Sequence, residues 1–221
     1  MGDTEEKDGI DLVTSDYERE WERQWARDDV PVGHLPVHRW YLRMDRPQDV
    51  EPLCTPRDDL HLKRIENPSV ELYRSLYNGV GEDYLWGDRR VWSDERLAAA
   101  IAPETIHLVV LQVGGETAGY FELDFANEAS TNINYFGLLP DFVGGGLGRY
   151  LLNACICYAA QRASVPLTLD TCSLDHPLAL QNYLKRGFAV IGHEDLVYPD
   201  PRLQGTIKRS AASQIPLARQ S

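Results

Sequence analysis

Four glycines fall within five residues of this 221-residue chain, in the run Gly-Gly-Gly-Leu-Gly at positions 144–148. The strand-like run 132–139 precedes them, and the helix-like run 147–162 follows. Glycine lets the backbone turn sharply because it carries no side chain, and the amides at the start of a helix attract anions. This stretch therefore predicts a bound phosphate or pyrophosphate.

Two common phosphate-binding loops do not fit these residues. The dinucleotide fingerprint requires a glycine at the position of Arg149. A Walker loop requires Gly-Lys followed by Ser or Thr, which this stretch lacks. What remains is Gly146-x-Gly148 at the start of a helix, with Arg149 beside it.

A second motif lies downstream of the glycine loop. Ala179, Tyr183, Gly187 and Phe188 follow the spacing Ala-x-x-x-Tyr-x-x-x-Gly-Phe. Together the two motifs resemble the GCN5-related N-acetyltransferase (GNAT) superfamily, over about residues 106–198. The resemblance implies the GNAT fold and an acyltransferase activity.

The resemblance also implies acetyl-CoA as the co-substrate. The loop amides would hold the pyrophosphate, and backbone amides at the end of the preceding strand would meet the pantetheine arm and the thioester oxygen. The family's loop begins with Gln or Arg, where this chain has valine. The residues expected to bind the cofactor are Gly137, Leu138, Val143, Gly144, Gly145, Gly146, Leu147, Gly148 and Arg149.

Amide formation requires a proton acceptor for the amine and a proton donor for the leaving thiolate. The resemblance makes Tyr183 the general acid, and a tyrosine that packs on the core is the alternative. Some family members carry a glutamate at the position of Asn132. Glu122 and Asp124 lie two residues apart on the preceding strand and so face one side of the sheet, which makes them candidate bases through water. Solvent-facing carboxylates are the plainer interpretation, and His176 is a third candidate base or a helix cap.

The acceptor pocket is expected from an aromatic, charged and aperiodic segment at residues 81–92. Tyr84, Trp86 and Trp92 would enclose an amine, and Asp83 or Asp88 would meet its charge. Alternatively, these aromatic side chains close the core beneath a loop. The sequence thus predicts direct acetyl transfer to an amine of a small molecule or peptide. The alternative function is a non-catalytic acyl-CoA-binding regulatory module on the same fold.

Apolar periodicity predicts the elements that position these residues. Helices are expected over 70–77, 94–101, 147–162 and 177–187, and strands over 37–44, 106–113, 117–125, 132–139, 166–171 and 188–197. Asn78-Gly79 would end the first helix, Ser93 would cap the second, and residues 45–68 are interpreted as mostly loop. A Gly-Gly hairpin and later strand–helix–strand units predict an α/β fold with a mixed, mostly antiparallel central sheet flanked by helices.

The expected domain organisation is simple. Residues 1–30 are interpreted as disordered with a short amphipathic segment, residues 31–209 as a single GNAT-like N-acetyltransferase domain, and residues 210–221 as a flexible tail. Tyr17, Trp21 and Trp25 form an aromatic stripe in the first segment. That stripe would dock on the core, or serve as a lid or as the contact of a homodimer.

Composition excludes several classes of function. A net charge of -12 argues against nucleic-acid binding, which requires basic residues against phosphates, and mildly favours a cationic amine. The 4 cysteines lack the spacing of a zinc site, so no metal is expected, and reduced cysteines fit a cytoplasmic protein. No apolar run approaches the length of a membrane span.

Overall fold

The computed structural model describes residue 25, residues 29–53 and residues 57–220. Tyr17 and Trp21 of the predicted aromatic stripe lie outside the described residues. The chain divides into two compact units: a central unit, Arg43–Leu169, and a terminal unit made of Met1–Leu42 and Asp170–Ser221. The sequence predicted a single domain over residues 31–209.

The central unit contains a mixed, mostly antiparallel sheet, as the sequence predicted. Strands β2 (Leu60–Ile65), β3 (Ile106–Val113), β4 (Glu116–Asp124) and β5 (Thr131–Leu138) pair antiparallel in this order. The start of β6 (Leu167–Cys172) pairs with β5 in parallel. The predicted β3–β4 hairpin is confirmed, and its two turn glycines have positive φ angles of 59° and 88°.

Strand β2 was missed by the sequence analysis, which interpreted residues 45–68 as mostly loop. Four consecutive residues of β2 are exposed, so the segment lacks the alternation of apolar and polar residues that marks a half-buried strand. Its antiparallel pairing with β3, from Leu60 opposite Val113 to Ile65 opposite Leu108, supplies the extended conformation instead.

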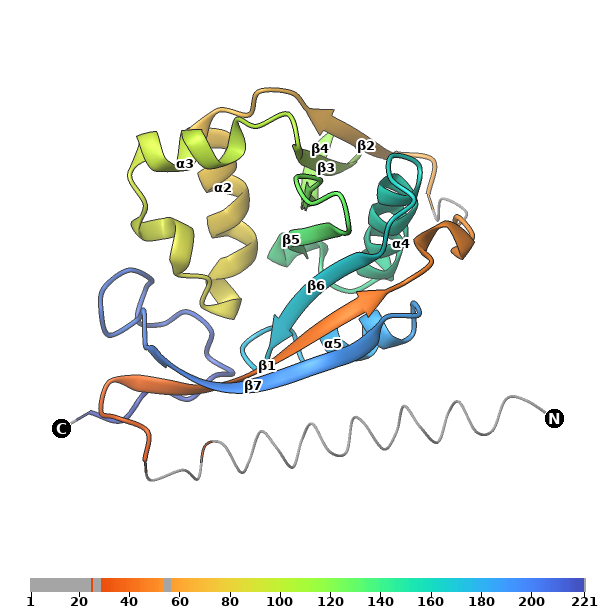
Figure 1. The fold of residues 1–221 in the computed structure, drawn as a ribbon. Coiled ribbons are helices and arrows are strands. Elements are labelled where there is room, and N and C mark those ends of the chain that lie inside the picture. Colours follow the sequence, from red (N-terminus) through yellow and green to blue (C-terminus); the bar gives the residue numbers. More distant parts are fainter. Residues whose placement is uncertain (1–24, 26–28, 54–56, 221) are drawn as a thin grey trace. The chain divides into compact units, whose positions relative to one another are not determined.

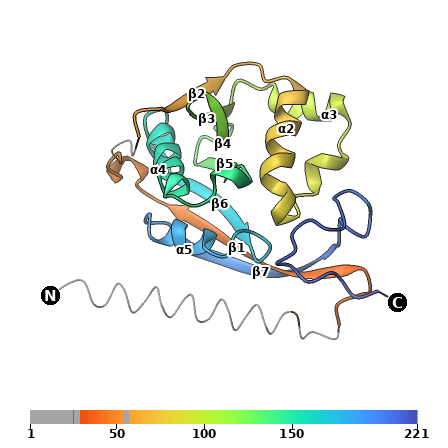
Figure 2. The same ribbon diagram turned by 180° about the vertical axis from the view of Figure 1, so that it is seen from behind.

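Helices cover both faces of this sheet. Figures 1 and 2 show α2 (Val70–Gly81) and α3 (Asp94–Ile101) on one face and α4 (Leu147–Ala160) on the other. The Ser93 hydroxyl accepts a hydrogen bond from the Arg96 amide, so the predicted cap of α3 is confirmed. Four short 3-10 helices complete the described part of the unit: Pro47–Asp49, Glu82–Tyr84, Asp88–Val91 and Pro140–Phe142.

The prediction that α2 ends at Asn78-Gly79 was wrong. The helix continues to Gly81, and its glycines permit close packing rather than a turn. A Cβ atom on Gly79 would lie 2.6 Å from Leu139 Cδ2, and a Cβ on Gly81 would lie 2.5 Å from Trp86 Cβ. Helix α2 therefore approaches its neighbours more closely than a residue with a side chain would allow.

The core on the α2 face of the sheet is rich in tyrosine. Its buried residues are Tyr73, Leu76, Tyr77, Val80, Leu97, Ile101, Leu108, Val110 and Tyr120. Burial of such large apolar surfaces is the main contribution to the stability of the fold. In the described part of the chain, no helix combines the length and the apolar character needed to cross a membrane.

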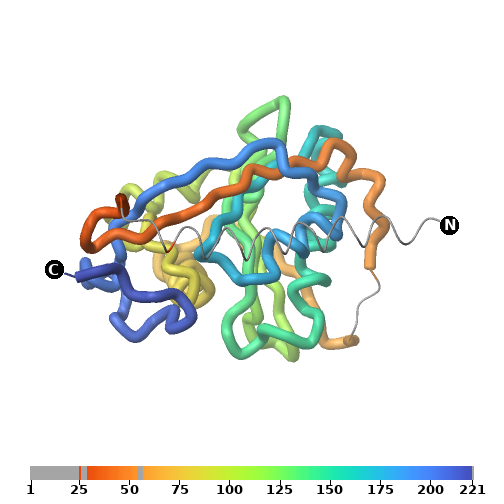
Figure 3. Tube along the Cα trace, turned by 90° about the horizontal axis from the view of Figure 1, so that it is seen from below, coloured from red at the N-terminus to blue at the C-terminus, as the bar shows by residue number. Residues whose placement is uncertain are grey.

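The terminal unit joins the two ends of the chain. Strand β1 (His34–Met44) lies between the end of β6 and β7 (Ala189–Pro199), and Figure 3 shows β1 and β7 side by side. The Asp200 amide donates to the Gly33 carbonyl at 2.9 Å, at the point where β7 ends. The short helix α5 spans Ala179–Leu184.

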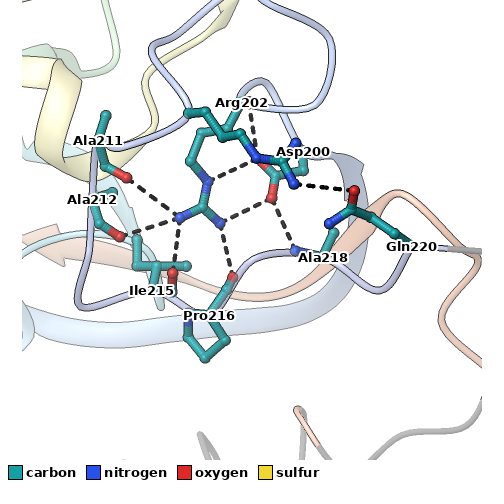
Figure 4. A network of polar contacts seen from close by, with 9 residues as sticks. Asp200, Arg202, Ala211, Ala212, Ile215, Pro216, Ala218 and Gln220 are labelled. Atoms are coloured by element: carbon teal, nitrogen blue, oxygen red, sulfur yellow. Dashed lines mark hydrogen bonds and ion pairs between the residues drawn. The ribbon is translucent and has the colours of Figure 1, made fainter.

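The segment after β7 winds around one buried arginine (Figure 4). The Arg202 guanidinium forms an ion pair with Asp200 at 2.9 Å, and both side chains are almost fully buried. It also donates to the backbone carbonyls of Ala211, Ala212, Ile215 and Pro216. Residues 210–220, which the sequence predicted as a flexible tail, thus have buried members and fixed backbone contacts.

Candidate functional site

The glycine loop joins the end of β5 to helix α4 in the central unit. Gly144, Gly145 and Gly146 have φ angles of 100°, 58° and 82°, a conformation that residues with side chains rarely adopt. A Cβ atom on any of the three would meet nothing within 4 Å. The glycines therefore serve the backbone conformation and leave one side of the loop open.

Helix α4 begins directly at this loop. Gly146 is its N-cap residue, and the buried Leu147 side chain anchors the first turn in the core. The first amides of a helix have no acceptor within the helix, and the helix dipole adds partial positive charge there. The exposed Arg149 side chain adds a full positive charge in the same turn, and Val143 is 47% exposed on the other side of the loop. The arrangement fits a pyrophosphate.

Strand β5 pairs with two different strands in the central unit. Within the described residues, it pairs with β6 at Thr131–Leu167 and Asn132–Thr168, and with β4 up to Leu138. The Leu139 amide donates to the Ala118 carbonyl of β4 at 2.8 Å, and since the peptide groups of a strand alternate between its two edges, the Leu138 amide faces away from β4. A pantetheine arm can bind a strand edge as a further strand does, through main-chain hydrogen bonds.

Gly137 and Leu138 lie on the second half of β5. A Cβ atom on Gly137 would lie 2.4 Å from Val80 Cγ1 of helix α2. The glycine is therefore required by the close packing of α2 against β5. That packing places α2 behind the strand and supports the segment whose amides were expected to meet the thioester.

Glu122 is fully buried on β4 and forms the centre of a polar network. The Arg89 guanidinium donates to both carboxylate oxygens, at 2.9 and 3.0 Å. The Tyr73 hydroxyl donates to Oε2 at 2.6 Å, and the Asn134 amide donates to Oε1 at 2.8 Å. A buried carboxylate is tolerated when it is paired and hydrogen-bonded in this way.

Burial and neighbouring charge shift the pKa values of two groups in this network, Arg89 and Tyr73. Burial alone would lower the pKa of Arg89, but the adjacent Glu122 carboxylate raises it above the ordinary value. Burial also raises the pKa of Tyr73 far above its ordinary range. Arg89 and Tyr73 therefore remain hydrogen-bond donors at neutral pH. The Arg89 guanidinium also lies 4.4 Å from the centre of the Tyr135 ring.

Asp124, the second carboxylate predicted as a base, lies at the end of β4 and is half-buried. Its Oδ1 accepts a hydrogen bond from the Ala126 amide at 2.8 Å. The surroundings of the two candidate carboxylates therefore differ. Glu122 is enclosed by strong donors, whereas Asp124 borders the turn that follows the strand.

The residues predicted for the acceptor pocket divide into two groups. Trp86 packs 5.2 Å from the Tyr135 ring, and the Arg89 guanidinium lies 5.4 Å from the Trp92 ring. These two side chains join the aromatic cluster around Arg89. The other two flank it, with Tyr84 half-buried and Asp88 exposed.

The sequence analysis did not identify Tyr73, Asn134 and Tyr135 as neighbours of the Glu122–Arg89 pair. Tyr73 and Tyr77 repeat with the spacing of one helical turn, which is a signal for a shared buried face of α2. Asn134 stands two residues after Asn132, on the same side of a strand. Neither of these patterns shows that Tyr73 and Asn134 share Glu122 as a hydrogen-bond acceptor.

Tyr183 belongs to the terminal unit, on helix α5. Its side chain is buried, and its ring meets the Phe188 ring edge-on at 5.9 Å. Gly187 has a φ angle of 95°, and the Phe188 amide donates to the Tyr183 carbonyl at 3.2 Å. The motif residues thus form one local turn. Nδ1 of His176 accepts from the Leu178 amide at 3.1 Å, within the turn that precedes α5.

Comparison with known sequences identifies one family. Residues 71–188 match the sequence model of the acetyltransferase (GNAT) family, so the match includes the α2 face, the glycine loop and the Tyr183 motif. The search among curated proteins gave no match.

Solved structures show the same fold at low sequence identity. A conserved protein of unknown function from Staphylococcus epidermidis matches with a TM-score of 0.56 and 17% identity, over 76% of this chain and 64% of that one. A GCN5-related N-acetyltransferase from Sphaerobacter thermophilus gives 0.54 and 19%, over 75% and 52%. The corresponding enzyme from Kribbella flavida gives 0.51 and 18%, over 78% and 63%. This chain therefore spans less than two thirds of each of these structures.

Proposed function

This chain belongs to the acetyltransferase (GNAT) family, and on that premise we propose that it transfers the acetyl group of acetyl-CoA directly to an amine of a small molecule or peptide. One observation carries the proposal. Three consecutive glycines in the left-handed conformation lead into helix α4 and leave the side of the loop open. A backbone of this form suits an anion that approaches the main chain closely.

The residues of the loop fit the proposed co-substrate. Residues 143–149 would hold the pyrophosphate through backbone amides, with the Arg149 side chain as an additional charge. Leu138, whose amide faces away from β4, would hold the pantetheine arm through its main chain, whereas the Gly137 amide faces β4. Acetyl-CoA supplies an activated acyl carbon when it is bound. The chain supplies the alignment of that carbon with the amine, which accounts for much of the rate in such reactions.

Two proton transfers remain to be assigned. We assign the general-acid role toward the sulfur to Tyr183, on the basis of its motif, and the base role to Asp124 acting through water. The contacts of Glu122 support this choice, because Arg89, Tyr73 and Asn134 already use its carboxylate oxygens. The backbone donor at Leu138 would stabilise the charge that develops on the thioester oxygen.

We assign the binding of the amine substrate to the segment that includes Tyr84, Trp86, Asp88 and Trp92. The aromatic cluster around Arg89 gives this segment an apolar wall, and the exposed Asp88 supplies a negative charge at its edge. A primary amine with an apolar or aromatic body matches this combination.

Isothermal titration of the full chain with acetyl-CoA tests the proposal. Gly146→Asp places bulk and negative charge beside the proposed pyrophosphate, so we expect it to abolish binding. Gly115→Asp is the matched control, because Gly115 also has a positive φ of 88° and open space, but lies in the β3–β4 turn. Retained binding by the Gly146 variant would show that the loop is assigned wrongly. Thiol release over a panel of amines then separates an enzyme from a module that merely binds acyl-CoA.

A further inference from the structure

A chain of side-chain hydrogen bonds crosses three strands of the central unit. The Thr168 hydroxyl donates to Asn132 Oδ1 at 2.9 Å, and Asn132 Nδ2 donates to Asn134 Oδ1 at 2.8 Å. Asn134 Nδ2 then donates to Glu122 Oε1 at 2.8 Å. The amide chain, Thr168–Asn132–Asn134–Glu122, therefore links β6 to β5 and β5 to β4.

Every bond in the amide chain points the same way, and the buried end determines the direction. The Glu122 carboxylate, in its ion pair with Arg89, only accepts, and the Arg89 guanidinium only donates. Asn134 must therefore present its NH₂ group to Glu122 and its oxygen to Asn132. Asn132 must in turn present its own oxygen to Thr168. The Glu122–Arg89 pair thus fixes the orientation of both amides.

The amide chain lies where β5 pairs with the start of β6. Asn132–Thr168 is one of the two residue pairs that join these strands within the described residues. Asn134 lies at an irregularity of the β4–β5 pairing, since Glu122 pairs with Tyr135 and Leu123 pairs with Ile133. Leu138 follows four residues later, about 13 Å along the strand. A shift at Asn134 would therefore change the direction of the strand segment that carries the Leu138 amide.

The amide side chains of Asn132 and Asn134 differ from carboxylates in what they can bond. An amide neither takes nor gives a proton at neutral pH. It does provide a donor and an acceptor at once, and both are used here. An aspartate in place of either asparagine would lack the NH₂ group that donates to the next residue of the amide chain.

We propose that Asn132 and Asn134 are positioning residues, which the Glu122–Arg89 pair orients so that they fix the first half of β5 between β4 and the start of β6. Through this fixed segment they set the direction of the Leu138 amide, which would meet the thioester. The catalytic part of this inference rests on the proposed acetyl transfer, whereas the structural part concerns β5 alone.

Exchanging the amide at position 134 and the carboxylate at position 122 tests the direction of the hydrogen bonds in the amide chain. Asn134→Asp places two carboxylates together and removes the donor to Glu122. The double variant E122Q/N134D restores the bond between positions 122 and 134, since the amide introduced at position 122 can donate to the new carboxylate. Its oxygen still accepts from Arg89 Nη1 and from Tyr73, whereas the bond from Arg89 Nη2 is lost. Hydrogen exchange of the free protein, read on the amides of residues 133–138, should be at least tenfold faster in N134D. It should return toward the wild-type rate in the double variant.

Kinetics of the same variants test the catalytic part. We expect N134D to lower kcat at least tenfold, because a small misplacement of aligned groups costs a large factor in rate. The Kd for acetyl-CoA should rise by a smaller factor than kcat falls, since the glycine loop that would hold the pyrophosphate is unchanged, and E122Q/N134D should recover part of kcat. Thr168→Val is a milder change, at the half-buried end of the amide chain. It should speed hydrogen exchange and lower kcat, each by a smaller factor than N134D does.

Some results would overturn the inference. Unchanged exchange on residues 133–138 in both N134D and T168V would do so, as would a double variant that is folded and binds acetyl-CoA but recovers neither exchange nor kcat. An equal loss of kcat and of acetyl-CoA affinity would indicate general damage and would also count against it. If wild type neither binds acetyl-CoA nor releases thiol, the proposed function fails, and the exchange measurement still decides the role of the amide chain.

Discussion

Tyr183 is the residue whose chemistry separates a transferase from a binding module. Its hydroxyl needs no shifted pKa to donate a proton to a thiolate that forms beside it. We expect Tyr183→Phe to lower kcat at least about tenfold, the lower end of what general acid catalysis contributes. The ring contact with Phe188 is retained in this variant, so the Kd for acetyl-CoA should be unchanged.

Thiol release and isothermal titration measure the two quantities. Tyr41→Phe is a suitable control, because Tyr41 is a partly exposed tyrosine of the same unit whose hydroxyl donates to Glu194. Full turnover by the Tyr183 variant would remove this residue from the mechanism.

Asp124 is the second residue whose role can be isolated. Asp124→Asn keeps an oxygen that can accept from the Ala126 amide, so the turn after β4 should be preserved. If Asp124 is the base, kcat/KM should fall at least about tenfold. A kcat/KM equal to that of wild type would assign the base elsewhere.

The sequence predicts those site residues that carry a local signal. Consecutive glycines before a helix reveal the loop, and fixed spacing reveals Tyr183. The Glu122 network carries no such signal, because its partner Arg89 lies 33 positions away and Tyr73 lies 49 positions away. Side chains at these separations meet because of the sheet register and the helix packing, which no local pattern specifies.

At the scale of elements, the packing of α2 against β5 depends on Gly137. Gly137→Ala should destabilise the protein by about 1–3 kcal/mol, the usual cost of overpacking, because the new Cβ meets Val80 Cγ1. Val80→Ala removes that atom, at the cost of buried methyl groups. The double variant should therefore show a favourable coupling of about 0.5–3 kcal/mol in a double-mutant cycle.

Urea unfolding of the four proteins provides the cycle. Additive effects of the two substitutions would show that β5 and α2 are not in the contact described, and that Gly137 is glycine for another reason. Gly115→Ala, in an open turn with positive φ, controls for backbone strain alone.

Element prediction succeeded where periodicity and capping agree. Helix α3 begins and ends as expected, because Ser93 supplies its cap and an apolar stripe follows. The end of α2 was misjudged because glycine has two uses, as a terminator and as a site of close packing. Strand β2 was missed because its residues are mostly exposed, so the pairing with β3 rather than its own pattern makes it a strand.

At the scale of the whole molecule, the terminal unit depends on residues from both ends of the chain. Strand β1 lies beside β7, and the Gly33 amide donates to the Arg219 carbonyl at 2.8 Å. The interpretation of residues 210–221 as a tail followed from their lack of periodicity. The partners of Arg202 are backbone carbonyls, which leave no trace in the residue types.

The Asp200–Arg202 pair should therefore control the stability of the terminal unit. Asp200→Asn would leave the buried Arg202 charge without its counter-ion. Such a loss typically costs about 3–5 kcal/mol. Unfolding in urea at neutral pH, followed by circular dichroism of the full chain, measures this cost. Asp141→Asn, at an exposed position of the 3-10 helix after β5, is the control and should cost little.

The pH dependence of stability gives an independent test of the same pair. Burial would raise the pKa of Asp200, but hydrogen bonds from Arg202 and from the Ala218 amide outweigh it and lower the pKa below the ordinary value. A carboxyl whose pKa is lower in the folded state stabilises the protein at pH values above its unfolded pKa, about 3.9. That stabilisation is lost as the pH falls through the lower, folded pKa. Wild type should therefore lose unfolding free energy more steeply below about pH 4 than the Asp200→Asn variant does. Equal acid slopes, together with equal stability at neutral pH, would mean that the C-terminal segment is held by contacts other than this ion pair.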